Sequence, residues 1–143
     1  MKVISKPFLK PLLLVFAVLA VGCGSLMATF DQTAYSQVTS LNVDAQALID
    51  KSTEDYSKHT ADVTALRLAL DKAIEYDKHR PNNQITNAMW GLMSDTTGHL
   101  LGGFLVKWRK DGKESPAFAA NIKVVIDSAF SQIAELEIKK IKK

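Results

Sequence analysis

The sequence has one cysteine, Cys23, and few residues that interrupt helices, with seven glycines and four prolines among 143 residues. A single cysteine excludes an internal disulfide and a zinc site built from several cysteines. Apolar residues make up 47% of the chain, which excludes a collagen-like chain, a low-complexity scaffold and a long disordered tail. The length allows one domain, or two very small ones.

Motifs that mark common active sites are also missing. The sequence contains no HExxH, GxSxG or SxxK motif, no phosphate-binding GxxxxGK[ST] motif and no CxxCH haem site. The histidines at 59, 79 and 99 do not have the HxxxH or ExxH spacing that places two metal ligands on one helix face. We therefore predict that the protein is not an enzyme and has no metal and no cofactor. A dispersed site joining a histidine to a serine or an acid is the alternative.

The N-terminal region has the pattern of an export signal. Residues 1–10 carry Lys2, Lys6 and Lys10 and no acid, and residues 11–21 form an uncharged apolar run. The sequence Leu-Ala-Val-Gly-Cys at 19–23 resembles the lipobox of bacterial lipoproteins. That resemblance implies that residues 1–22 are a signal peptide, that lipid is attached to Cys23, and that residues 23–30 form a lipidated N-terminus and short tether. Since Gly24 rather than Asp follows the cysteine, it also implies an outer-membrane location facing the periplasm.

The alternative for this region is an uncleaved anchor, because residues 11–30 carry no charge and are long enough to span a bilayer. Either way the membrane is a predicted partner. Loss of residues 1–22 would remove three of the 18 basic residues and no acid, which leaves 15 of each sign. The basic character of the precursor therefore does not indicate nucleic-acid binding. We expect no nucleic-acid partner, and another envelope protein as a further partner.

Residues 31–143 are predicted to form an all-α domain. Apolar or small residues recur at steps of three or four between 35 and 73, which is the spacing of one helix face. This first stripe consists of Tyr35, Val38, Leu41, Ala45, Leu48, Ser52, Tyr56, His59, Val63, Leu66, Leu70 and Ala73. Asp31 is predicted to cap the start of this helical region through its carboxylate. The polar stretch 50–62 favours two helices, about 31–57 and 60–80, although the unbroken stripe keeps one long helix open.

The second half predicts three more helical segments. Asn83 opens a short one, residues 94–98 form a turn, and Leu100, Leu101, Phe104, Leu105 and Trp108 share one face of the next. Ser115 followed by Pro116 marks the start of a last helix that runs to about residue 142. Its four lysines after residue 138 are predicted to complement the helix dipole or to touch anionic lipid. Such lengths and short turns predict an up-and-down helical bundle, with an elongated bundle as a variant.

The segment around Gly102 is the most distinctive candidate binding site. Gly102 and Gly103 lie inside an apolar helical pattern, where each glycine costs about 1 kcal/mol relative to alanine. They predict a close approach of backbone, made either by the chain itself or by a partner that docks at Gly102, Gly103, Phe104 and Trp108. Trp90 and Trp108 are interpreted as buried anchors, and His59 with Asp62 as a solvated pair.

The predicted function is that of a membrane-anchored envelope lipoprotein with a non-enzymatic interaction or structural role. The alternative is a helical bundle that binds a small apolar ligand or lipid. That alternative predicts a cavity lined by Met89, Met93, Leu100, Leu101 and Phe104.

Overall fold

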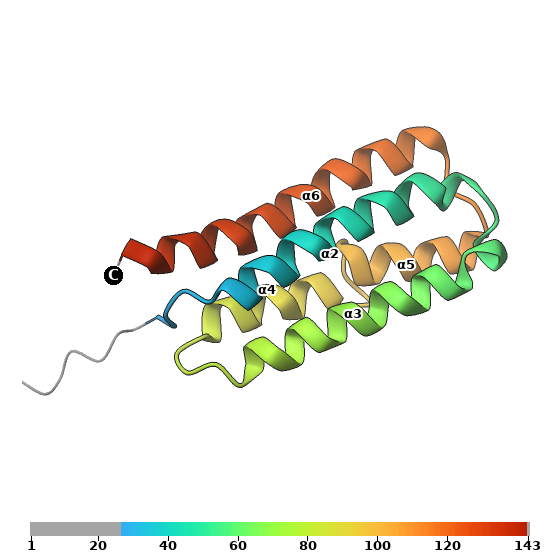
Figure 1. The fold of residues 1–143 in the computed structure, drawn as a ribbon. Helices are drawn as coiled ribbons and strands as arrows, with labels where there is room; N and C mark the ends of the chain where they lie inside the picture. Colours follow the sequence, from blue (N-terminus) through green and yellow to red (C-terminus); the bar gives the residue numbers. More distant parts are fainter. Residues whose placement is uncertain (1–26, 143) are drawn as a thin grey trace, which may run out of the picture.

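The structure, a computed structural model, describes residues 27–142, and within this range its regular elements are all helices (Figure 1). The prediction of an all-α fold is confirmed. The α-helices are α2 (Gln32–Asp50), α3 (Thr60–Lys78), α4 (Gln84–Ser94), α5 (Leu101–Asp111) and α6 (Pro116–Lys139). Three short 3₁₀ turns complete the set: η1 (Lys51–Thr53), η2 (Tyr56–Lys58) and η3 (Lys140–Lys142).

The helices form an elongated up-and-down bundle, as expected. Helix α2 packs against α3 and α6, α3 packs against α4, and α4 also contacts α6. The short helices α4 and α5 follow one another along the bundle and together form one of its arms (Figure 1). Helix α6 has 24 residues and is therefore roughly 36 Å long. The described chain begins and ends at the same end of the bundle (Figure 1).

Two of the helix starts follow directly from local sequence. The Asp31 carboxylate accepts a hydrogen bond from the Ala34 amide at 2.8 Å and caps α2. The Ser115 hydroxyl accepts from the Phe118 amide at 3.2 Å and caps α6, with Pro116 as the first helical residue. Both predicted caps are confirmed. The last α-helix ends at Lys139, and the chain tightens into η3 where the sequence predicted more α-helix.

The first stripe is divided between two helices, as the polar stretch indicated. Helix α2 ends at Asp50, earlier than the predicted residue 57, and α3 starts at Thr60. Ser52 is nevertheless fully buried, and the rings of Tyr56 and His59 lie against Trp108, with centroids 5.3 and 5.7 Å away. The stripe therefore records which residues face the core, whether or not the backbone stays helical between them.

One continuous apolar core runs along the bundle and includes Trp90 and Trp108, both of which are fully buried as predicted. On α4 the buried side chains are Thr86, Trp90 and Met93, whereas Ile85 and Leu92 are exposed. Among the helices of residues 27–142, none combines the length and the apolar character required to cross a membrane.

Candidate functional site

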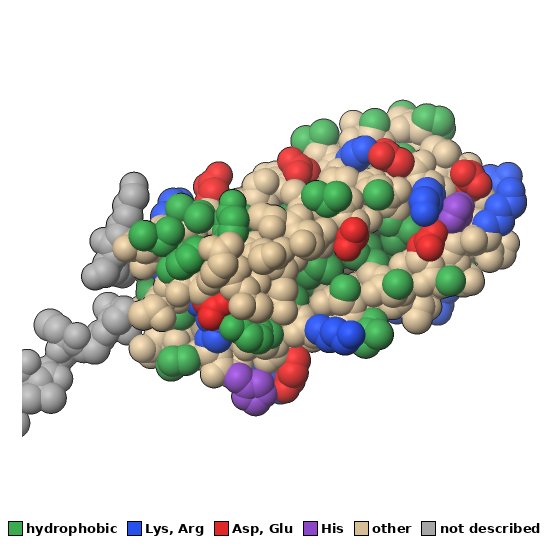
Figure 2. Space-filling view, in the orientation of Figure 1, with side chains coloured by type: hydrophobic (Ala, Val, Ile, Leu, Met, Phe, Trp, Pro, Cys, Tyr) green, Lys and Arg blue, Asp and Glu red, His purple; other side chains and the backbone are tan. Residues whose placement is uncertain are grey.

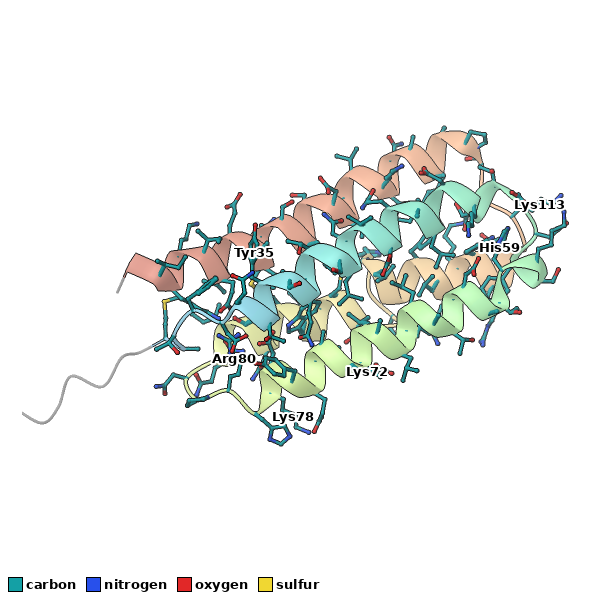
Figure 3. The ribbon with its side chains drawn as sticks, viewed as in Figure 1. Tyr35, His59, Lys72, Lys78, Arg80 and Lys113 are labelled. Carbon is teal, nitrogen blue, oxygen red and sulfur yellow. The ribbon has the colours of Figure 1, made fainter. Side chains whose placement is uncertain are left out.

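The end of the bundle at which the described chain enters and leaves holds the largest group of buried polar residues. We call it the tether end: residues 27–31, the end of α3 with the loop to α4, the first turn of α4, and the last turns of α6 with η3. Arg80 and Lys78 lie at this end, whereas His59 and Lys113 lie at the far end (Figure 3).

Arg80 joins two buried acids from different helices. Its guanidinium donates to Asp77 Oδ1 at 2.7 Å and to the two carboxylate oxygens of Glu137 at 2.7 and 3.1 Å. Asp77 is 3% exposed and Glu137 is 2% exposed. A two-pronged contact between a guanidinium and a carboxylate is among the strongest polar contacts in proteins, and it fixes the orientation of both groups. Helices α3 and α6 are thereby joined at this end.

Lys140 completes a group that we call the ionic cluster: Asp77, Arg80, Glu137 and Lys140. Its ammonium donates to Glu137 at 2.5 Å, to Asn83 Oδ1 at 2.8 Å and to Thr86 Oγ1 at 3.1 Å. Lys140 is only 6% exposed. Of the two predicted roles of the C-terminal lysines, contact with anionic lipid is therefore wrong for Lys140, whereas its place at the C-terminus of α6 fits the helix dipole. Its long side chain turns inward because a buried carboxylate without such partners would be strongly destabilising.

Asp77 is satisfied almost entirely by buried donors. Trp90 Nε1 donates to Asp77 Oδ2 at 2.6 Å, and Asn83 Nδ2 donates to Asp77 Oδ1 at 3.1 Å. The ionic cluster therefore borders directly on the apolar core through the Trp90 indole. Burial by itself would raise the pKa of Glu137, but hydrogen bonds from Arg80 and Lys140 outweigh it and hold that pKa below its ordinary value. Burial opposes the charge of Arg80, and its two acids more than compensate, so its pKa is raised.

The same cluster holds the entering chain against the bundle. The Ala28 amide donates to the Asn82 carbonyl at 2.8 Å, Arg80 donates to the Thr29 carbonyl at 2.6 Å, and the Asp31 amide donates to Glu137 at 2.8 Å. We call these three bonds the clamp. They connect residues 28–31 to the α3–α4 loop and to α6. The chain is therefore fixed to the bundle before α2 begins.

A further bond ties the cap of α2 to the end of α3. Tyr76 Oη donates to Asp31 Oδ2 at 2.9 Å. This hydrogen bond is the main reason why the pKa of Tyr76 is raised. Burial would raise the pKa of Asp31, but the amide of Ala34 and the Tyr76 hydroxyl together lower it. Asp31 thus serves as helix cap and as a second link between the entering chain and α3.

The ionic cluster was missed at the level of sequence, although the signal is present. The α3 part of the first stripe continues from Leu70 and Ala73 in a step of four to Asp77. The stripe of α6 continues from Phe130 and Ile133 through Glu137 to Lys140 in steps of four and three. Charged residues in phase with an apolar stripe indicate buried ion pairs, and here both stripes reach them at the same end.

The predicted glycine site is occupied by the chain itself. A Cβ atom on Gly102 would overlap the carbonyl of Ser94, and one on Gly103 would overlap the carbonyl of Gly98. The first carbonyl belongs to the last residue of α4 and the second to the loop between α4 and α5. The predicted turn is present in this loop, where Asp95 Oδ1 accepts from the Thr97 amide at 2.8 Å. The close approach expected at these glycines is therefore intramolecular.

Phe104 and Trp108 lie mostly inside the core. Their rings are stacked with centroids 6.2 Å apart, and Trp108 Nε1 donates to the Glu54 carbonyl at 3.2 Å. Phe104 and Gly103 also border a surface pocket of about 580 Å³ beside Lys107. Of the residues predicted to line a ligand cavity, Met93, Leu101 and Phe104 are packed within the core. Partner or ligand binding at these positions stays a prediction.

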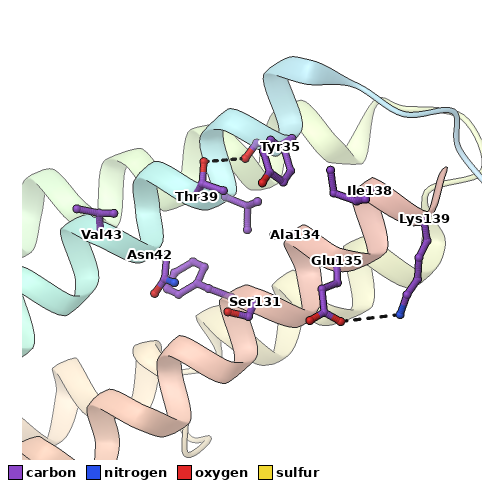
Figure 4. A pocket seen from close by; sticks show the side chains of 11 residues that line it. Tyr35, Thr39, Asn42, Val43, Ser131, Ala134, Glu135, Ile138 and Lys139 are labelled. Carbon is purple, nitrogen blue, oxygen red and sulfur yellow. Dashed lines mark hydrogen bonds and ion pairs between the residues drawn. The ribbon is translucent and has the colours of Figure 1, made fainter. Parts of the chain in front are cut away.

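A surface groove of about 630 Å³ lies between α2 and α6 and was not predicted (Figure 4). Its lining is mainly apolar, and Val43 on its wall is 68% exposed. The groove reaches the tether end, where Tyr35, Ile138 and Lys139 border it. Its lining residues are Tyr35, Val38, Thr39, Asn42, Val43, Phe130, Ser131, Ala134, Glu135, Ile138 and Lys139.

The histidines do not form a shared site in the part of the chain that the structure describes. His59 lies 3.5 Å from Asp62, as paired in the prediction, but its ring packs on Trp108 and its side chain is only 13% exposed. The expectation of a solvated pair is therefore wrong for His59. His79 contacts Glu75 at 2.8 Å on the surface of α3. Residues 27–142 contain no group of three or more histidine, cysteine or acidic residues placed to bind a metal.

Cys23, the predicted lipid-attachment residue, lies outside the described residues. Comparison with known proteins gives no relative for any part of the chain: no protein-family model matches it, and neither does a curated protein or a solved structure.

Proposed function

We propose that the protein is a bacterial envelope lipoprotein, attached to the outer membrane through Cys23, whose helical bundle interacts with another envelope component. The basic and apolar N-terminal pattern with Leu-Ala-Val-Gly-Cys at 19–23 carries this proposal. The clamp supports it, because it fixes residues 28–31, which follow the proposed lipid site, to the bundle. The partners that hold these residues lie in the loop after α3 and in α6.

The clamp limits how far the bundle can lie from the anchor. Ala28 is five residues after Cys23, and an extended chain covers at most about 3.6 Å per residue. The lipidated residue and the tether end can therefore be separated by roughly 18 Å at most. Several acyl chains give stable attachment where a single chain does not. The bundle would thus be kept close to the bilayer by its tether end.

Replacement of the cysteine tests the attachment. In the Cys23→Ala variant, metabolic labelling with a fatty acid should be lost, and the precursor should no longer be cleaved before residue 23. A Ser25→Ala variant, which keeps the cysteine, serves as the control and should be labelled and cleaved normally. Lipid labelling that persists in Cys23→Ala contradicts the assigned attachment residue.

Crosslinking in intact cells tests the interaction role. A photo-reactive amino acid at Val43 probes the open groove, and the same residue at Leu68 probes the surface of α3, where a leucine is similarly exposed. We expect a discrete crosslinked product from Val43 and none from Leu68. A scan of exposed positions that gives no discrete product at any of them contradicts an interaction with another envelope protein.

A further inference from the structure

Exposed apolar side chains are distributed unevenly between the two ends of the bundle. Ile85, Ile138 and Ile141 lie in the first turn of α4, the last turn of α6 and η3, and they are 57%, 39% and 58% exposed. Among the described residues, the far end (η1, η2 and the turn from α5 to α6) has no large hydrophobic side chain with comparable exposure. Figure 2 shows hydrophobic side chains gathered near the tether end.

Two exposed lysines at the tether end lie next to acids. Lys78 lies 3.4 Å from Glu75, and Lys139 lies 3.9 Å from Glu135. Lys140 does not add to the exposed charge because it is buried against Glu137. The exposed isoleucines therefore distinguish this end of the bundle from the far end.

We infer that the tether end rests in the interfacial region of the bilayer through Ile85, Ile138 and Ile141. This inference rests on the proposed lipid attachment at Cys23. The short segment between Cys23 and Ala28, together with the clamp, brings this end and no other to the bilayer surface. Apolar side chains at the lipid headgroups are removed from water, while the lysines beside them keep their charged groups in the aqueous layer. The bundle then stands with its far end directed away from the membrane.

Fluorescence quenching in vesicles tests this orientation. The full lipidated protein is purified from membranes, lipid on Cys23 is verified by mass spectrometry, and the protein is placed in phosphatidylcholine vesicles that contain brominated lipid. An environment-sensitive fluorescent residue replaces Gln84 at the tether end or Lys113 at the far end, both of which are exposed. We expect strong quenching and a blue-shifted emission at position 84, and the emission of a water-exposed probe at position 113.

Matched variants identify the side chains responsible. Ile85→Ser with Ile141→Ser should reduce the quenching at position 84 several-fold, whereas Leu68→Ser with Leu92→Ser removes two exposed leucines elsewhere and should leave it unchanged. Thermal unfolding by circular dichroism verifies that both pairs are folded. Addition of phosphatidylglycerol in equal parts should change the quenching little, because the contact is apolar.

Each contrary outcome has a distinct meaning. Equal quenching at positions 84 and 113, or none at 84, on protein with lipid on Cys23 overturns the inference and leaves the proposed attachment intact. Quenching at position 84 that requires phosphatidylglycerol shows an electrostatic contact and also overturns it. Purified protein without lipid on Cys23 overturns the proposed attachment together with the inference.

Discussion

At the level of single residues, the Glu137 side chain connects several segments at the tether end. It accepts hydrogen bonds from Arg80, from Lys140 and from the Asp31 amide, and so meets three segments of the chain. A buried carboxylate with this many donors is stable only while all of them are present. The position therefore tolerates neither loss of its charge nor loss of its partners.

The Glu137→Gln variant should be destabilised by about 3 kcal/mol at neutral pH, because it leaves Arg80 and Lys140 buried with too little compensating charge. The measurement is urea unfolding followed by circular dichroism. Glu135→Gln, which changes an exposed acid on the same helix, is the control and should cost well under about 1 kcal/mol.

The same carboxylate makes stability depend on pH. The pKa of Glu137 in the folded protein lies below its ordinary value of 4.5, so the native state favours the charged form. Its contribution is complete above the unfolded-state value and is lost as the pH falls below about 4.5 through the folded-state value. Unfolding free energies measured between pH 7 and pH 3 should therefore fall less steeply in Glu137→Gln than in the wild type. Identical slopes would show that the cluster does not stabilise the charged carboxylate.

The glycines give a second contrast at the residue level. Gly103→Ala should destabilise the protein strongly, by about 2 kcal/mol or more, because its methyl group meets the carbonyl of Gly98 in a rigid turn. Gly91→Ala places the same group on the exposed surface of α4 with nothing within 4 Å, and should stabilise by about 0.5–1 kcal/mol. Thermal unfolding measures the change in stability of the two variants relative to the wild type. Equal effects would mean that the α4–α5 turn moves aside readily.

At the level of elements, the starts of α2 and α6 differ in how they are held. The start of α6 has a local cap, whereas the start of α2 has a local cap and a contact to another helix. Ser115 caps α6 through one local hydrogen bond, so Ser115→Ala should lower the free energy of unfolding by about 1 kcal/mol. Asp31 caps α2 and also accepts a hydrogen bond from Tyr76, so Asp31→Ala should lower the free energy of unfolding by more than Ser115→Ala does. A double-mutant cycle with Tyr76→Phe, measured by urea unfolding, isolates the contribution of the Tyr76–Asp31 hydrogen bond to the free energy of unfolding. A coupling energy of zero would show that Asp31 acts only as a cap.

Helix boundaries that depend on neighbouring residues could be predicted from the sequence, and those that depend on distant contacts could not. The caps at Asp31 and Ser115 and the break before Thr60 were predicted, because each depends on neighbouring residues. The end of α2 at Asp50 was not, since the buried Ser52 keeps the stripe in phase beyond the helix.

The candidate site was less predictable than the fold. Lysines near a helix end indicate solvent exposure by composition, yet Lys140 is buried because Glu137, Asn83 and Thr86 meet it from two helices. On α4, Ile85 is exposed and Thr86 is buried for the same reason, since Thr86 accepts a hydrogen bond from the buried ammonium. Such choices depend on which ends of the helices meet, and no local pattern contains that information.

At the level of the whole molecule, the clamp should make the order of the entering chain depend on Arg80. In Arg80→Met, the loss of a partner for two buried acids lowers the stability of the whole bundle, and the loss of the clamp adds a local effect. Hydrogen exchange should therefore accelerate more at the Ala28 and Asp31 amides than at amides near Trp108 at the other end. Arg67→Met, which changes a half-buried arginine within α3, is the control. Uniform acceleration throughout the bundle would show that Arg80 supports global stability rather than the local clamp.

The position of the clamp also determines how the protein responds to traction. A pull on residues ahead of Ala28 is carried at once by the loop after α3 and by the end of α6, as well as by α2. The force is distributed over several hydrogen bonds, including one from a charged guanidinium, so the first turn of α2 does not unwind by itself. A protein held at a moving or strained envelope surface would in this way keep its first helix wound under tension.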